Sequence, residues 1–198
     1  MKRRHKIAVI LIFVLLSPLI FWGYIHSKPV TLATPGDLSE VRTGDIILTV
    51  GHSFKSSMVM AFERKTPETE EYSHIGLFIK NGDSTCIAHM SIDQGYIIKE
   101  SITEFIVNNK VLKYDIYRIN GYTLDTIKLH SIIDSLTNIR KPFDRMFDMH
   151  SEEAYYCTEL VYKTFKKAGI SEIERISYEK YLYPNEFVKS EIFTRFGE

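Results

Sequence analysis

The hydrophobic and polar positions of this chain follow two different periods. Between residues 44 and 119, most segments are short runs of β-branched and aromatic residues bounded by glycine or polar residues, which predict β-strands. After residue 122, apolar residues recur every three to four positions, which predicts helices with one buried face. The predicted strands are 44–50, 73–80, 83–91, 95–100 and 110–119, and the predicted helices are 52–65, 123–139, 154–169 and 183–193.

Turn and capping residues mark the ends of several predicted elements. Asn81-Gly82 lies between two strands and predicts a β-hairpin. Ser101 and Glu104 have the spacing of a capping box and predict a further short helix, and Gly169 marks the end of the helix that precedes it. A block of strands followed by helices predicts an α+β domain, in which an antiparallel sheet packs on a helical layer.

The first 28 residues differ from the rest of the chain. A basic start, MKRRHK, precedes an uncharged apolar run over residues 7–25. At about 1.5 Å per residue, this run is just long enough to cross a membrane core of about 30 Å. We therefore expect an uncleaved transmembrane signal anchor over residues 1–28, a linker over 29–43 and a folded domain over 44–198. A cleaved signal peptide is the alternative, but no small-residue cleavage site follows the run.

The distribution of charge indicates where the domain works and what it does not bind. Five of the 25 Lys and Arg residues precede Pro29, whereas all 25 acidic residues follow it, so the remainder has a formal charge of −5. The positive-inside rule places the basic end in the cytoplasm and the domain outside, in the cell envelope. A mildly acidic domain without a basic stripe is a poor nucleic-acid binder, so we expect no nucleic-acid partner.

Cys157 lies where the predicted helix 154–169 begins. A helix N-terminus stabilises a thiolate through its unpaired N–H groups and its positive end, and the same N–H groups can hold an oxyanion. This position therefore suits a nucleophile. A buried structural cysteine is one alternative. A disulfide with Cys86, the other cysteine of the chain, is a second alternative for a domain outside the cytoplasm.

A nucleophilic thiol needs a base, and the predicted hairpin offers one. If Asn81-Gly82 forms a two-residue loop, His74 lies directly opposite His89 on one sheet face. One imidazole can then hydrogen-bond the other, which is the orienting contact that a general base needs. A zinc site drawn from Cys86, His89, His74 and Cys157 is an alternative. Strand alternation disfavours it, because Cys86 and His89 are three residues apart and leave opposite faces.

Four segments of the sequence resemble a known family. GDIILTV, YSHIGLFI, KPFDRMFD and YYCTELVY are similar to segments of the permuted papain-like amidases of the YaeF/YiiX type, which are relatives of the NlpC-type cell-wall hydrolases and of the lecithin–retinol acyltransferases. The resemblance covers about residues 40–190. As in the permuted group, the histidine strand comes before the cysteine helix. The resemblance implies a circularly permuted papain-like fold.

The same resemblance implies roles for three residues. Cys157 matches the nucleophile, His74 matches the base, and His89 matches a third polar residue on the next strand, although the surrounding CIAHM departs from the usual pattern. We therefore expect a thiol hydrolase that cleaves an amide or ester through an acyl-enzyme, without a metal or an organic cofactor.

The substrate class is less narrowly predicted than the chemistry. Expected substrates are cell-wall peptides or lipid-like acyl amides and esters of the cell envelope. The alternatives are an acyltransferase or phospholipase-like enzyme that uses the same residues, and a non-catalytic binding module that keeps the fold.

Overall fold

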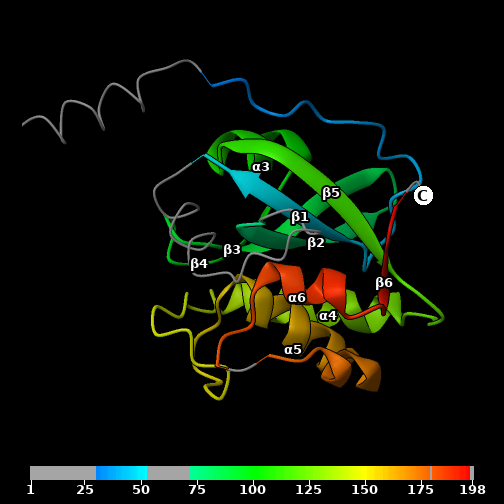
Figure 1. The fold of residues 1–198 in the computed structure, drawn as a ribbon, viewed down its shortest axis with the longest axis vertical. Helices are drawn as coiled ribbons and strands as arrows, with labels where there is room; N and C mark the ends of the chain where they lie inside the picture. The colour runs from blue at the N-terminus through cyan, green and yellow to red at the C-terminus, as the bar shows by residue number, and fades with distance from the viewer. Residues whose placement is uncertain (1–29, 53–71, 179, 197–198) are drawn as a thin grey trace, which may run out of the picture. The chain divides into compact units, whose positions relative to one another are not determined.

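A six-stranded antiparallel sheet forms the centre of the structure, in the order β4-β3-β2-β1-β5-β6 (Figure 1). The structure is a computed structural model that describes residues 30–52, 72–178 and 180–196. The strands are β1 (Ile46–Gly51), β2 (His74–Asn81), β3 (Ser84–Ser91), β4 (Tyr96–Glu100), β5 (Val111–Ile119) and β6 (Phe193–Arg195).

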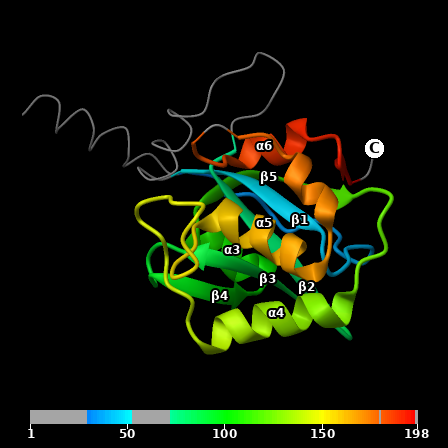
Figure 2. The same cartoon turned by 90° about the horizontal axis from the view of Figure 1, so that it is seen from below.

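Helices cover both faces of this sheet. Helix α3 lies on one face, and α4, α5 and α6 lie on the other (Figures 1 and 2). The helices within the described residues are α3 (Ile102–Asn108), α4 (Thr126–Asn138), α5 (Cys157–Ala168) and α6 (Pro184–Lys189), with a 3-10 turn at Ser171–Arg175. Each face has its own apolar core, and strand alternation supplies both: Ile47 and Phe78 pack with Phe105 of α3, whereas Ile75 and Leu77 pack with α4 and α5.

Most of the predicted elements are confirmed. The predicted strands match β1 to β5, and the antiparallel α+β arrangement is present. The capping box of Ser101 and Glu104 begins α3, and Gly169 ends α5 with a φ of 100°, a left-handed conformation that favours glycine. The helix predicted over 183–193 is wrong in its second half. It stops at Lys189, and Phe193 instead pairs with Ile119 of β5.

Two predictions lie outside the described residues. These are the membrane anchor over residues 1–28 and most of the helix predicted over 52–65. Within the part of the chain that the structure describes, no helix has both the length and the apolar character of a membrane span.

The register of the β2–β3 hairpin differs from the predicted one by two residues. Asn81 pairs with Ser84, so Gly82 and Asp83 form the loop in place of Asn81-Gly82. Gly82 has a φ of 58° and can take the left-handed position at the start of a tight hairpin turn without strain. His74 is therefore not directly opposite His89 but diagonal to it. A shift of two residues keeps every side chain on its original face, so both imidazoles still share one face.

Candidate active site

Three polar side chains from neighbouring strands form a hydrogen-bonded chain, which we call the histidine relay. His74 is the first residue of β2, and its Nε2 lies 3.0 Å from Nδ1 of His89 on β3. Nε2 of His89 lies 2.8 Å from a carboxylate oxygen of Glu100, the last residue of β4. Since His89 is only 1% exposed, the middle of the relay is shielded from water.

Helix α3 covers the relay. The ring of Phe105 stacks on His74, with centroids 5.8 Å apart and an interplanar angle of 21°. The same ring meets His89 edge-on, with centroids 4.9 Å apart. Asn108, at the end of α3, donates a 2.6 Å hydrogen bond to the second carboxylate oxygen of Glu100. One helix thus holds all three members of the relay in place.

Burial and charge set the protonation of the relay. Removal from water disfavours the charged form of His74, and the charge that His89 can carry adds to this, so the pKa of His74 lies well below its usual 6.5. Burial by itself would raise the pKa of Glu100. Hydrogen bonds from His89 and Asn108 outweigh burial, and the pKa of Glu100 lies below its usual 4.5. At neutral pH the relay therefore holds a neutral His74 and an ionised carboxylate.

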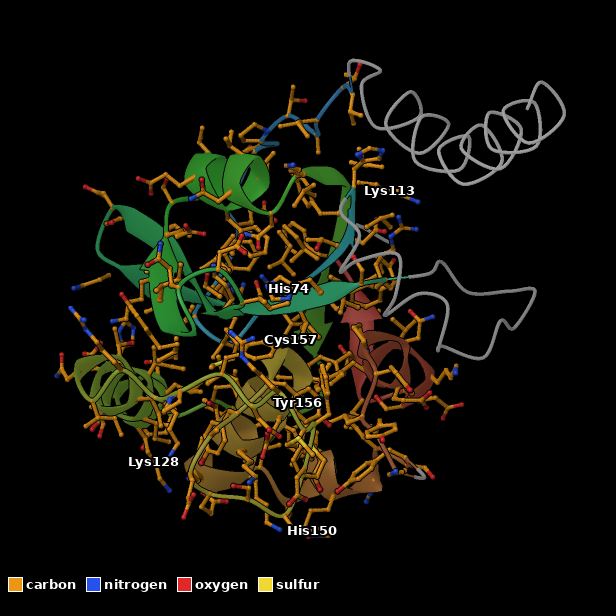
Figure 3. All side chains as sticks on the ribbon, turned by 90° about the vertical axis from the view of Figure 1, so that its left-hand side faces the viewer. His74, Lys113, Lys128, His150, Tyr156 and Cys157 are labelled. Atoms are coloured by element: carbon orange, nitrogen blue, oxygen red, sulfur yellow. The ribbon has the colours of Figure 1, made fainter. Side chains whose placement is uncertain are left out.

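Cys157 is the first residue of α5, which begins three residues later than the predicted start at residue 154, so Cys157 lies at the N-terminus of the helix itself. This helix packs against β2 and β3, the strands that carry the two histidines. Figure 3 shows Cys157 below His74, where the sheet meets the start of the helix. The N–H of Cys157 is one of the first four amide groups of the helix, which have no partner inside the helix.

A second network of charged side chains lies behind the start of α5. We call Glu152, Tyr155, Glu159 and Lys163 the helix-start cluster. Glu159 is fully buried, accepts a 3.2 Å hydrogen bond from the backbone N–H of Tyr156, and lies 2.8 Å from Nζ of Lys163. Lys163 also lies 2.8 Å from Glu152.

The charges of the helix-start cluster are shared unevenly. Burial raises the pKa of Glu159 to about 7, because the charge of Lys163 is divided between Glu159 and Glu152 and does not offset the burial fully. The hydroxyl of Tyr155 donates a 2.5 Å hydrogen bond to Glu152. Nζ of Lys163 also lies 4.8 Å from the centroid of the Tyr155 ring. The cluster therefore pairs its charges with one another, and Glu159 holds the backbone N–H of Tyr156 just before Cys157.

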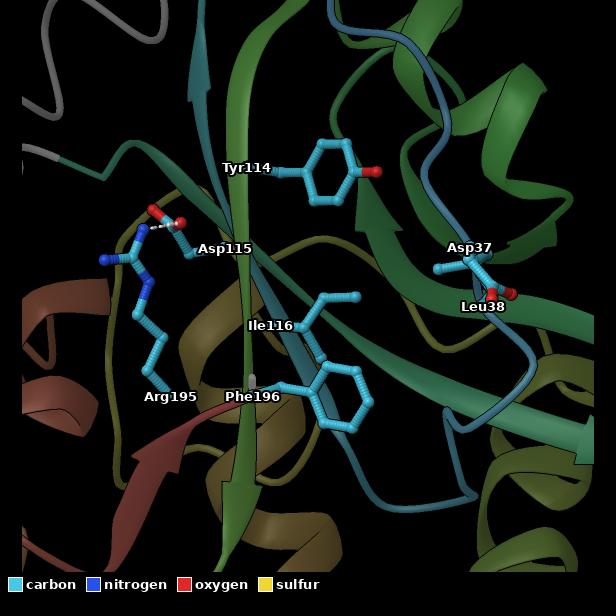
Figure 4. A pocket seen from close by; sticks show the side chains of 7 residues that line it. All are labelled: Asp37, Leu38, Tyr114, Asp115, Ile116, Arg195 and Phe196. Atoms are coloured by element: carbon cyan, nitrogen blue, oxygen red, sulfur yellow. Dashed lines mark hydrogen bonds and ion pairs between the residues drawn. The ribbon is translucent and has the colours of Figure 1, made fainter. Parts of the chain in front are cut away.

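A pocket of about 390 Å³ lies at another place on the domain, between β5, the segment before β1 and the end of β6 (Figure 4). Asp115 and Arg195 form an ion pair on one side of β5, and Tyr114 and Phe196 lie on the other side. Neither Cys157 nor any residue of the histidine relay lines this pocket. We assign the pocket no chemical role, since the buried Asp115 and the half-buried Arg195 form an ion pair with each other.

The disulfide and zinc alternatives do not fit the described residues. Cys86 and Cys157 are not joined by a disulfide. Within the described ranges, no group of three or more His, Cys, Asp or Glu side chains is arranged to hold a metal ion. The facing nitrogens of His74 and His89 are at hydrogen-bond distance, and the other donor nitrogen of His89 is used by Glu100. We therefore derive no step through a metal.

The sequence matches the family of permuted papain-like amidases of the YaeF/YiiX type (peptidase family C92) over residues 40–195. The chain belongs to this family. Its general class is that of an amidase-like cysteine hydrolase. In this chain the histidine strand β2 precedes the cysteine helix α5, as the resemblance implies.

A solved structure supports the fold of this chain. The chain is similar to the metalloprotein yiiX from Escherichia coli O157:H7, with a TM-score of 0.62 and 19% sequence identity. The match covers 79% of this chain and 97% of that chain. At this identity the likeness shows a shared fold. Comparison with curated proteins gave no match.

Glu100 is the member of the relay that the sequence reasoning missed. His89 pairs with Ile98, and Ile87 pairs with Glu100, so strand alternation places Glu100 on the same face as His89. The available signal was a carboxylate at the end of the otherwise apolar strand YIIKE. It could not be interpreted without the β3–β4 register, which a turn of several residues leaves open.

Proposed function

We propose that this permuted amidase is a thiol hydrolase in which Cys157 is the nucleophile, His74 is the general base and His89 orients His74. Membership in a family of papain-like amidases supports the reaction class. The observation that carries the assignment is the 3.0 Å contact between His74 and His89, on the strands against which the helix of Cys157 packs. It leaves the second ring nitrogen of His74, Nδ1, to act on the thiol.

The reaction follows from these roles. Nδ1 of His74 takes the proton of the Cys157 thiol, and the thiolate attacks the carbonyl carbon of an amide or ester. The backbone N–H of Cys157, at the positive end of α5, stabilises the negative oxygen of the tetrahedral intermediate. His74 returns the proton to the leaving amine or alcohol as the carbon–heteroatom bond breaks. Water, deprotonated by the same imidazole, then hydrolyses the thioester and restores the thiol.

We further propose that the substrate belongs to the cell envelope and is a wall peptide or a lipid-like acyl amide or ester. The apolar run over residues 7–25 and the basic residues before it support an anchored protein whose domain lies outside the cytoplasm. Protease added to cells with a permeable envelope should then degrade the domain. Protection of the domain, or a soluble product that lacks residues 1–28, would contradict the anchored topology.

The decisive experiment is a product screen on wall fragments and N-acyl amino acids, with the Cys157→Ala variant as the control. We expect hydrolysis products only with the wild-type protein. Labelling of Cys157 with iodoacetamide, followed by peptide mapping, tests the thiol without knowledge of the substrate. Rapid labelling at neutral pH is expected for an activated thiol. A labelling rate equal to that of a simple thiol, together with no product, would overturn the proposal.

A further inference from the structure

We propose that Glu100 is a positioning residue, which acts through His89 to set the tautomer of His74 that leaves Nδ1 without a proton for Cys157. This inference rests on the proposed function, because it gives His74 the role of base. It adds a residue from a third strand, β4, to the pair of histidines that the sequence singles out.

The tautomers follow from the chemistry of the contacts. An ionised carboxylate can only accept hydrogen bonds, so Nε2 of His89, 2.8 Å from Glu100, carries its proton there. In a neutral imidazole the other nitrogen is then bare, and Nδ1 of His89 becomes an acceptor. The facing Nε2 of His74, 3.0 Å away, must therefore be the donor. By the same rule, Nδ1 of His74 is bare and can receive a proton.

The position of Glu100 makes this arrangement specific. Its side chain is only 11% exposed, so water competes little for the carboxylate. Asn108 occupies its second oxygen at 2.6 Å, which prevents the carboxylate from rotating away from His89. Phe105 packs on both imidazoles and holds their rings in the planes that the hydrogen bonds require. Without Glu100, His89 could adopt either tautomer, and the second tautomer would leave the proton on Nδ1 of His74.

Glu104 on α3 is another charged group near this carboxylate. Hydrogen bonds with Ser101 in the capping box lower the pKa of Glu104 and outweigh the opposing charge of Glu100. The Glu104→Gln variant is therefore a matched control. It removes a carboxylate from the same surroundings, leaves the relay intact, and keeps the capping box, because glutamine also completes one.

The test measures the rate at which iodoacetamide alkylates Cys157, from acidic to alkaline pH, in wild-type, Glu100→Ala, Glu100→Gln and Glu104→Gln proteins. We expect Glu100→Ala to slow alkylation at neutral pH by about 10–100-fold, the range typical of removing the hydrogen-bond partner of a metal-ligating histidine. Glu100→Gln should lose less, since its amide oxygen still accepts from Nε2 of His89. Glu104→Gln should behave as the wild type.

The pH profile separates positioning from a merely structural role. Iodoacetamide alkylates the thiolate, so the rate rises with pH as the thiolate–imidazolium pair forms. The negative charge of Glu100 stabilises the imidazolium, so its loss should move this rising limb to higher pH in both Glu100 variants. A general loosening of the fold would lower the rates without moving that limb.

Two-bond ¹H–¹⁵N correlation spectra give a direct reading of the tautomers. Both histidines should carry their proton on Nε2 in the wild type, and His89 should show mixed tautomers in Glu100→Ala.

The outcomes distinguish this inference from the proposed function. If wild-type Cys157 labels no faster than a simple thiol and the product screen yields no product, the proposed function fails. If wild-type Cys157 labels rapidly and His74→Ala abolishes this, but Glu100→Ala matches Glu104→Gln in rate and in pH limb, only the role of Glu100 is overturned. A proton on Nδ1 of His89 in the wild type would also overturn it. Should Glu100→Ala fail to fold, the Glu100→Gln profile and its spectra decide the question alone.

Discussion

The histidine relay and the helix-start cluster are both networks of titratable side chains beside the proposed nucleophile, yet they are built in opposite ways. The relay ends on an imidazole nitrogen that its own hydrogen bonds leave unused. The helix-start cluster places Lys163 between two carboxylates, Glu152 and Glu159, at 2.8 Å from each. The charges of the cluster therefore pair with one another, whereas the hydrogen bonds of the relay leave Nδ1 of His74 for a partner.

This difference separates a reacting network from a supporting one. Both contain buried groups with shifted pKa values, and such shifts by themselves do not distinguish catalysis from structure. The pKa of His74 is lowered and that of Glu159 is raised, so the two networks should also respond to pH with opposite sign. The reactivity of Cys157 therefore tests the relay, and the free energy of unfolding tests the helix-start cluster.

The largest expected effect is the loss of turnover when the nucleophile or the general base is removed. Cys157→Ala and His74→Ala should each reduce hydrolysis by at least about 10³-fold, and the double variant should cost little more, because residues that act as a unit are not additive. Steady-state rates of hydrolysis of the substrate that the product screen identifies check this. Full additivity of the two losses would show that the two residues act independently.

Disruption of the helix-start cluster should reduce stability and spare reactivity. Lys163→Met leaves Glu159 buried without its cation, which should lower the free energy of unfolding by about 3 kcal/mol in urea denaturation. Alkylation of Cys157 should stay within about threefold of wild type, a change of less than about 1 kcal/mol, because Glu159 still holds the N–H of Tyr156. Lys167→Met is the control, since this lysine is 45% exposed and its ion pair with Glu152 should contribute little.

Replacements of His89 should give a graded loss of turnover. His89→Ala removes the contact that orients His74 and should reduce kcat/KM by about 10–100-fold. His89→Asn or His89→Gln should retain more activity, because an amide oxygen can still accept from Nε2 of His74. Equal losses in all three variants would contradict an orienting hydrogen bond, and a fully active His89→Ala would remove His89 from the site.

A further expected effect is the pH dependence of stability. The folded-state pKa of Glu159 is raised from 4.5 to about 7, so the folded protein binds more protons than the unfolded chain between these values. This contribution is present below about pH 4.5 and is lost as pH rises through about 7, with a slope of at most about 1.4 kcal/mol per pH unit. Denaturation curves of Glu159→Gln should lack the decline.

The relay should show the reverse dependence. Because the pKa of His74 is lowered, its contribution to stability is present above the unfolded value of 6.5 and is lost as pH falls. His74→Ala should therefore flatten the acidic side of the stability curve, whereas Glu159→Gln should remove the decline toward neutral pH. If both variants changed the curve with the same sign, the contrast between the two networks would be wrong.

Local sequence was sufficient for much of the fold and for part of the site. The alternation of side chains along β2 and β3 puts His74 and His89 on one face under either register, since only a shift of one residue would separate them. The position of Cys157 at a helix start follows from the apolar period behind it and from Gly169 at the helix end. These features depend on backbone geometry within a few residues, which the amino-acid types themselves favour.

Tertiary structure decided the features that join distant segments. Gly82, in a left-handed conformation, and Asp83 form the hairpin loop, one residue later than predicted. This register makes the two histidines diagonal neighbours. The three residues of β6 become a strand only because β5 offers them an edge, and no periodicity marks so short an element. Glu100 entered the relay because β4 pairs with β3 in one particular register and α3 holds its carboxylate in place. Residue type and period determine which groups can react, but partners far apart in the chain meet only when packing selects one register among several of similar local energy.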